Sequence, residues 1–164
     1  MNNDIMPDRS TDADASETAG RALPARPRRI LVVDDEPAAR VLANRVFSEA
    51  GFEVITVQSG FECLERFRKQ PRGFDLILLD LSMPFMDGEE TFRRLREINP
   101  DVVVLLSTGF MAQERVDRML AAGMAGFIRK PHRPDELLAR VQAILEDVKQ
   151  ARAGCAASDM AASV

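Results

Sequence analysis

The chain of 164 residues contains no Trp, no Tyr and a single His. Without Trp or Tyr it offers few aromatic side chains on which nucleic-acid bases could stack. Its formal net charge of −4 argues against binding to duplex nucleic acid by the domain as a whole. We therefore expect no nucleic-acid partner.

Cysteines and long apolar runs are also scarce. Cys63 and Cys155 fit neither a disulfide framework nor the spacing of a zinc site, and this thiol usage suits the reducing cytoplasm. The longest apolar runs, such as residues 102–106, are far too short to span a bilayer. Residues 1–20 contain no apolar stretch of the kind found in a secretory signal. We expect a cytoplasmic protein without a membrane partner.

Three segments differ in composition. Residues 1–27 hold few large apolar side chains, are first acidic and then basic, and are expected to be a disordered tail. A docking arm for an acidic partner is the alternative interpretation of that tail. Residues 28–149 form the expected domain, and residues 150–164 are expected to be a second disordered tail.

Within the domain, short apolar runs alternate with segments whose apolar residues recur at helical spacing. Apolar strands joined by helices predict a parallel sheet that is covered on both faces. Because crossover connections are right-handed, we expect an α/β fold with a doubly wound, five-stranded parallel sheet. The expected strands are 30–33, 54–57, 76–79, 102–106 and 127–128.

Polar residues follow four of these strands, at the sheet edge where α/β proteins bind their ligands. They are Asp34-Asp35-Glu36, Asp80, Ser107-Thr108-Gly109 and Arg129-Lys130-Pro131. Carboxylates that lie close together repel each other unless a cation sits among them, and Mg²⁺ prefers carboxylate oxygens. The pattern therefore predicts a Mg²⁺ site.

A carboxylate beside such a cation can act as a nucleophile and accept a phosphoryl group. A metal held by Asp35 and Asp80 would neutralise one phosphoryl oxygen, Lys130 a second, and the Thr108 hydroxyl would donate to the third. Each residue alone has an ordinary explanation as a helix cap, a turn, a strand residue or a surface lysine. The hypothesis depends on the agreement of all four strand ends.

Four motifs occur in the order and at the separations of a known family. They are Val32–Pro37, Leu79–Gly88, Leu106–Phe110 and Phe127–Pro131. Over about residues 28–149 the chain resembles the receiver domains of two-component response regulators. The resemblance implies a flavodoxin-like (βα)5 fold with strand order 2-1-3-4-5.

The resemblance also implies roles for individual residues. Asp80 is the expected phosphoacceptor. Mg²⁺ (or Mn²⁺) is expected to bind Asp35 and Asp80 directly, the backbone carbonyl of Ser82, and Asp34 through water. Thr108 is the expected switch hydroxyl, with Lys130 as its cationic partner.

Three further features follow from the family. Phe127 occupies the position of the rotating aromatic residue, and the Lys130–Pro131 bond resembles one that is cis. Ser82 and Phe110 occupy positions that tune the lifetime of the phosphoryl group, and Phe110 is expected to shield it from water.

The implied function is a bacterial signalling switch. A histidine kinase or histidine phosphotransfer protein would phosphorylate Asp80, and the fourth helix, fifth strand and fifth helix would contact an unknown downstream protein. The domain is no conventional enzyme, but it would catalyse its own Mg²⁺-dependent phosphoryl transfer and autodephosphorylation. No second-domain pattern follows Gln150, and both a stand-alone regulator and the receiver of a hybrid kinase fit.

Other functions fit less well. A dinucleotide site needs a Gly-rich turn where this chain has Asp34–Pro37, and a phosphatase would carry a second Asp at position 82, which is Ser. A receiver-like interaction module that works without phosphorylation remains the alternative. His132 is expected to be a loop residue.

Overall fold

The computed structural model describes residues 26–109 and 113–161, with residues 154–161 described by their backbone alone. Most of the expected N-terminal tail and Phe110 therefore lie outside the described residues. Five strands and five helices alternate along the described chain, as predicted. They are β1 (Arg29–Val33), α1 (Pro37–Glu49), β2 (Glu53–Val57), α2 (Gly60–Lys69), β3 (Leu76–Asp80), α3 (Gly88–Ile98), β4 (Val104–Thr108), α4 (Gln113–Ala121), β5 (Gly126–Arg129) and α5 (Pro134–Ala161).

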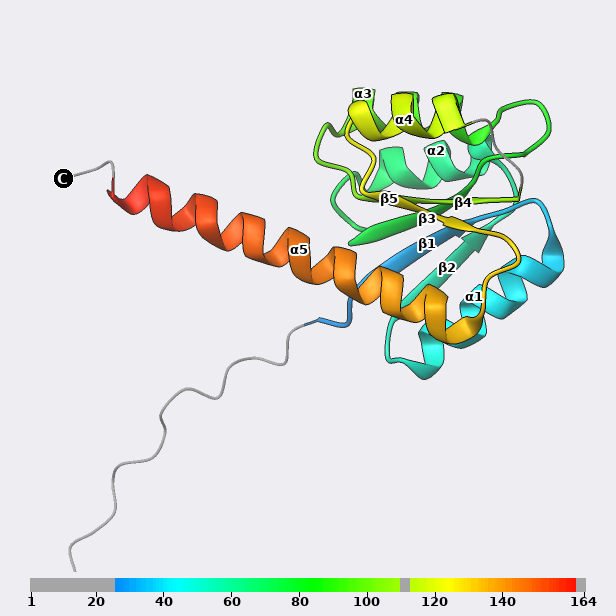
Figure 1. Ribbon diagram of the computed structural model, residues 1–164, viewed down its shortest axis with the longest axis horizontal. Coiled ribbons are helices and arrows are strands. Elements are labelled where there is room, and N and C mark those ends of the chain that lie inside the picture. The colour runs from blue at the N-terminus through cyan, green and yellow to red at the C-terminus, as the bar shows by residue number, and fades with distance from the viewer. Residues whose placement is uncertain (1–25, 110–112, 162–164) are drawn as a thin grey trace, which may run out of the picture.

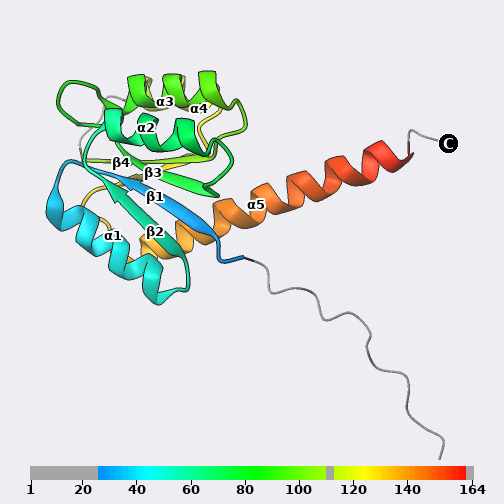
Figure 2. The same ribbon diagram turned by 180° about the vertical axis from the view of Figure 1, so that it is seen from behind.

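All strands are parallel, and their order is β2-β1-β3-β4-β5, which confirms the predicted fold class and strand order. Helices α1 and α5 cover one face of the sheet, while α2, α3 and α4 cover the other (Figures 1 and 2). The register pairs Val33 with Leu79 and Asp80 with Ser107. The carboxyl ends of β1, β3 and β4 are therefore level with one another.

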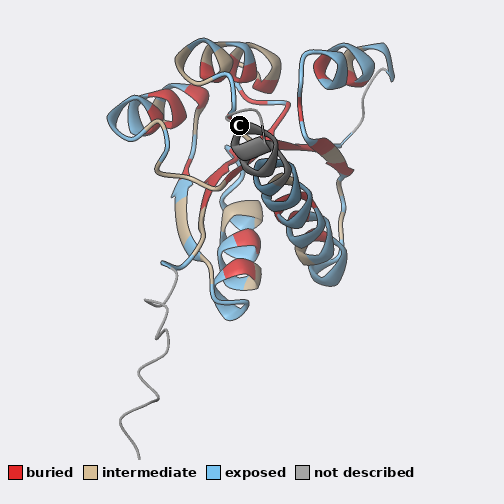
Figure 3. Ribbon diagram, turned by 90° about the vertical axis from the view of Figure 1, so that its left-hand side faces the viewer, coloured by how far each residue is buried: buried red, intermediate tan, exposed pale blue. Residues whose placement is uncertain are grey.

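The core consists of two apolar layers, one on each face of the sheet. Alternate residues of β1 divide between them: Leu31 and Val33 pack toward α2 and α3, whereas Ile30 and Val32 pack toward α1 and α5. All residues of β3 are buried, and Figure 3 shows the buried sheet between helices whose outer faces are exposed. Burial on both faces explains why these strands are continuously apolar rather than alternating.

Helix α5 differs from the sequence prediction. Leu137, Val141 and Ile144 are buried against the sheet, as the helical spacing indicated. The helix then continues to Ala161 instead of giving way to a disordered tail near residue 150, and it extends beyond the sheet in Figure 1. The segment after Gln150 is rich in Ala, the strongest helix former, so its backbone propensity favours continuation of the helix. None of the described helices is long and apolar enough to cross a membrane.

Phe85 lies in the loop between β3 and α3 in an unusual conformation. Its φ is 66°, in the left-handed region that a bulky residue rarely adopts, and its side chain is 99% exposed. The ring therefore contributes almost no burial that would offset the backbone cost of this conformation.

Replacement of Phe85 with Asn is expected to raise the free energy of unfolding by about 1 kcal/mol, because Asn tolerates the left-handed region. Urea unfolding at neutral pH would measure the change. Phe85→Ala is the matched control: it removes the ring but keeps the Cβ, so it should leave stability nearly unchanged. Equal gains from both variants would show that the ring, and not the backbone, is unfavourable.

Candidate functional site

The acidic loop after β1 begins the candidate site. Asp34 is buried, and its Oδ1 accepts a hydrogen bond from the Glu36 amide at 3.0 Å. The Asp34 amide donates to the Val57 carbonyl of β2 at 3.2 Å, and Pro37 starts α1 as predicted. Asp35 is exposed at the surface of this loop. One carboxylate is therefore fixed by the fold, and the next is accessible to solvent.

Asp80 is the last residue of β3, and it is only 4% exposed. Its Oδ2 accepts a hydrogen bond from the Ser82 amide at 3.0 Å. The start of α3 approaches so closely that a Cβ on Gly88 would lie 2.5 Å from the Asp80 carbonyl oxygen. Glycine at this position is thus a steric requirement of the loop that carries Asp80.

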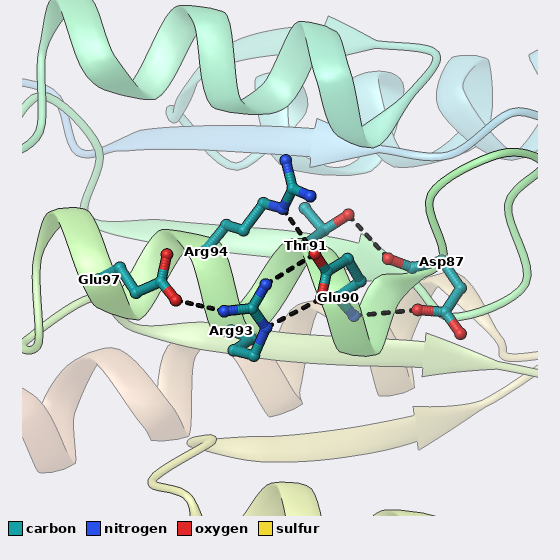
Figure 4. A network of polar contacts seen from close by, with 6 residues as sticks. All are labelled: Asp87, Glu90, Thr91, Arg93, Arg94 and Glu97. Carbon is teal, nitrogen blue, oxygen red and sulfur yellow. Dashed lines mark hydrogen bonds and ion pairs between the residues drawn. The ribbon is translucent and has the colours of Figure 1, made fainter.

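The N-terminus of α3 is held by a polar network that Figure 4 shows. Asp87 caps the helix by accepting from the Glu90 amide at 2.9 Å, and the Thr91 hydroxyl donates to the Asp87 carbonyl at 2.7 Å. From α4, Arg115 donates to Asp87 Oδ2 and to Glu89 Oε2, each at 2.8 Å. These two ion pairs join α4 to the N-terminal end of α3, which follows the loop that carries Asp80.

Lys130, which follows β5, connects the two buried carboxylates. Its Nζ donates to Asp34 Oδ2 at 2.7 Å and lies 2.9 Å from Asp80 Oδ1. Burial alone would lower the pKa of Lys130, but the hydrogen bonds and charges of both carboxylates outweigh it, so the pKa is raised. Burial raises the pKa of Asp80, Lys130 opposes that shift, and the charges of Asp34 and Asp35 add to it.

The donor set fits a hard divalent cation. One carboxylate oxygen from each of Asp34, Asp35 and Asp80 lies within 4.8 Å of the others. Three carboxylates and one ammonium leave a net charge of −2 when all are ionised, and Mg²⁺ typically takes one or two carboxylates in such a site. The structure therefore brings together the acidic residues and the lysine that the sequence singled out.

Thr108 ends β4 on the same edge. Its side chain is 2% exposed, and its Oγ1 has no hydrogen-bond partner among the described residues. Its carbonyl accepts from the Lys130 amide at 2.6 Å, and the following Lys130–Pro131 bond is cis, in agreement with the prediction. Phe127 on β5 is partly buried against the layer under α2 and α3. A buried hydroxyl without a partner is costly and is able to donate to a ligand.

His132 lies in the predicted loop, between β5 and α5. Its Nε2 is 3.4 Å from the Ser107 hydroxyl, and burial lowers the pKa of the ring. The sequence did not reveal this contact, because Ser107 and His132 are far apart in the chain. It also did not reveal Arg40, which contacts the acidic loop, although a position on the first turns of α1 could have suggested it.

Comparison with known proteins identifies the family. A model of the response regulator receiver domain matches residues 30–142. The chain therefore belongs to the response regulator receiver family. Receiver domains bind Mg²⁺ in an acidic pocket and interact with histidine kinases and phosphotransfer proteins.

A curated relative is also a response regulator. The response regulator MprA of Mycobacterium sp. (strain KMS) is 38% identical over 122 residues, which cover 73% of this chain and 51% of the relative. The chain spans about half the length of the curated relatives it matches.

Solved structures show the same fold. A receiver domain protein of Clostridium thermocellum has a TM-score of 0.71 at 25% identity, covering 75% of this chain and 98% of that one. A CheX–CheY–BeF3–Mg²⁺ complex of Borrelia burgdorferi has a TM-score of 0.69 at 27% identity, covering 72% and 89% of the two chains.

Replacement of Lys130 with Met is expected to lower the free energy of unfolding by about 2 kcal/mol in metal-free buffer at neutral pH, because it leaves buried carboxylates unpaired. The loss should shrink as the pH falls, since burial raises the pKa of Asp80 and its protonation removes part of the uncompensated charge. Chemical unfolding in EDTA at several pH values would measure it.

Lys69→Met is the matched control. Lys69 pairs with Glu65 on the surface of α2, where both side chains are 69% exposed, so its loss should cost no more than about 0.5 kcal/mol. A pH-independent loss in Lys130→Met would contradict the electrostatic explanation.

Proposed function

We propose that the chain is a phosphorylation-dependent signalling switch that accepts a phosphoryl group on Asp80. The observation that carries this proposal is the Lys130 ammonium between Asp34 and Asp80, with contacts of 2.7 and 2.9 Å, inside a cluster of three carboxylates. A purely structural core would not converge three carboxylates on one sheet edge. The chemistry of a phosphoryl acceptor requires that arrangement.

In the proposed reaction, a carboxylate oxygen of Asp80 forms a bond to phosphorus as the donor bond to phosphorus breaks. The donor is a phosphohistidine of a kinase or phosphotransfer protein, and the electron pair of the broken P–N bond stays on its imidazole nitrogen. Lys130 neutralises charge on the transferred group. Attack by water on the phosphorus would then break its bond to the Asp80 oxygen, releasing inorganic phosphate and the free Asp80 carboxylate.

Asp35, Asp80 and the backbone carbonyl of Ser82 would hold Mg²⁺ directly, with Asp34 binding through water. When bound, the metal neutralises the charge of the carboxylates and of the phosphoryl group. Asp35 is exposed while Asp34 is buried and already paired, which supports this division of roles. The relative from Borrelia burgdorferi, whose complex contains BeF3 and Mg²⁺, supports the assignment.

The Thr108 hydroxyl would respond to phosphorylation of Asp80 by forming a hydrogen bond to the phosphoryl group. Its buried Oγ1 lacks a partner among the described residues, and a phosphoryl group on Asp80 would supply an acceptor. Movement of Thr108 would then allow Phe127 to reorient, changing the face formed by α4, β5 and α5. A groove of about 540 Å³ between β5 and α5, lined by Phe127 and Arg140 among others, is available on that face for a downstream protein.

A phosphorylation-independent module is the competing function. Such a module would not need Asp35, Asp80, Thr108 and Lys130 together, so the complete set favours the switch. We place the protein in the cytoplasm, where histidine kinases transfer their phosphoryl groups.

Acetyl phosphate with Mg²⁺ is expected to add one phosphoryl group to the purified protein, detectable by intact-mass spectrometry. Asp80→Asn should abolish the addition because the amide is a poor nucleophile. EDTA should prevent it, and excess Mg²⁺ should restore it.

Asp101→Asn is the matched control. Asp101 is exposed and lies before β4, at the edge of the sheet away from the acidic cluster, so labelling should be unchanged. No added mass in the parent protein would favour the phosphorylation-independent module, and labelling of Asp80→Asn would place the acceptor elsewhere.

A further inference from the structure

Arg40 on α1 contacts the acidic loop from the side of its main chain. A single guanidinium nitrogen, Nη1, donates to the carbonyl of Asp34 at 2.6 Å and to the carbonyl of Asp35 at 3.0 Å. The Arg40 amide also donates to the Glu36 carbonyl at 3.2 Å, within the first turn of α1. The residue thus holds three consecutive carbonyl groups of the loop.

The loop has few other restraints at this point. Glu36, the N-cap of α1, makes no side-chain capping hydrogen bond. The Asp34 carboxylate is fixed by the Glu36 amide and Lys130. No hydrogen bond among the described residues holds the exposed Asp35 carboxylate. The direction of the Asp35 side chain therefore depends on the peptide groups on either side of it, whose carbonyls are the ones that Arg40 binds.

The geometry points to Arg40 as a positioning residue for the metal site: by binding the Asp34 and Asp35 carbonyls, it orients the Asp35 carboxylate toward the cation. This inference rests on the proposed function, because it assigns Asp35 as a direct metal ligand. Arg40 does not touch the metal or the phosphoryl group. It acts through the backbone of the residue that does.

Arg40 has two opposite effects on metal affinity, and a measurement of whether its removal weakens or strengthens binding shows which effect is larger. Its positive charge lies near the carboxylates and repels a divalent cation, so charge alone would make Arg40 weaken binding. Ordering of the loop makes it strengthen binding, because a flexible ligand loses conformational entropy when the metal binds. The guanidinium contacts the carbonyls rather than the carboxylates, and Arg40 is only half-buried, so solvent partly screens its charge and the ordering effect is expected to prevail.

The test is a titration of the metal-free protein with Mn²⁺, in which electron paramagnetic resonance measures the free ion. Arg40→Met is expected to raise the dissociation constant about fivefold to tenfold, which is within the range for the loss of one typical hydrogen bond. Arg40→Lys should recover most of the affinity, since an ammonium group can donate to two carbonyls. Thermal unfolding without metal would verify that each variant is folded.

Labelling with acetyl phosphate supplies a second readout. The Mg²⁺ concentration that gives half of the maximal rate should rise in Arg40→Met, while the rate at saturating Mg²⁺ should match the parent. If Arg40 only stabilised the fold, its loss would not raise the half-maximal Mg²⁺ concentration while leaving the rate at saturating Mg²⁺ unchanged.

Arg45→Met is the matched control, because Arg45 is also on α1 and pairs only with the exposed Glu49 in the described residues. It removes the same charge and should not change Mn²⁺ affinity. Unchanged or tighter binding in Arg40→Met, weakening of equal size in Arg45→Met, or no recovery in Arg40→Lys would each overturn the inference. A parent protein that binds no Mn²⁺ would overturn the proposed function as well.

Discussion

The ammonium group of Lys130 is the interaction on which the site depends. It joins the loop after β5 to the ends of β1 and β3 through contacts of 2.7 Å to Asp34 and 2.9 Å to Asp80. Without a cation at this point, carboxylates buried on adjacent strands would repel one another or take up protons. The raised pKa of Lys130 keeps the ammonium charged, so the site is organised before any metal binds.

The fold and the grouping of the site residues could largely be predicted from the sequence, for a physical reason. Continuously apolar strands are stable only where both sheet faces are covered, and parallel strands place their carboxyl ends on one edge. Asp34, Asp80, Thr108 and Lys130 each follow or end such a strand, so their convergence follows from the fold class. The roles assigned to them came from the family resemblance rather than from spacing.

The contacts that the sequence could not reveal are those set by tertiary geometry. Arg40 and Arg115 are ordinary helix-surface arginines by pattern, and only the packing of α1 and α4 brings them to acidic loops. Glycine is required at position 88 because a Cβ there would lie 2.5 Å from the Asp80 carbonyl oxygen. No pattern in the neighbouring sequence indicates this close approach. Helix α5 is longer than its apolar spacing predicts, because the alanines after Gln150 favour helix without contributing to that spacing.

The direction of α5 has a practical consequence. This helix starts beside the acidic edge and runs back past the amino ends of the strands, where Arg28 pairs with Glu146 at 3.2 Å (Figure 2). Both ends of the described chain therefore leave from the side opposite Asp80. A fluorophore, an immobilising linker or a fused reporter attached near residue 26 or near residue 161 would leave the carboxylates open to small phosphodonors and to a docking protein.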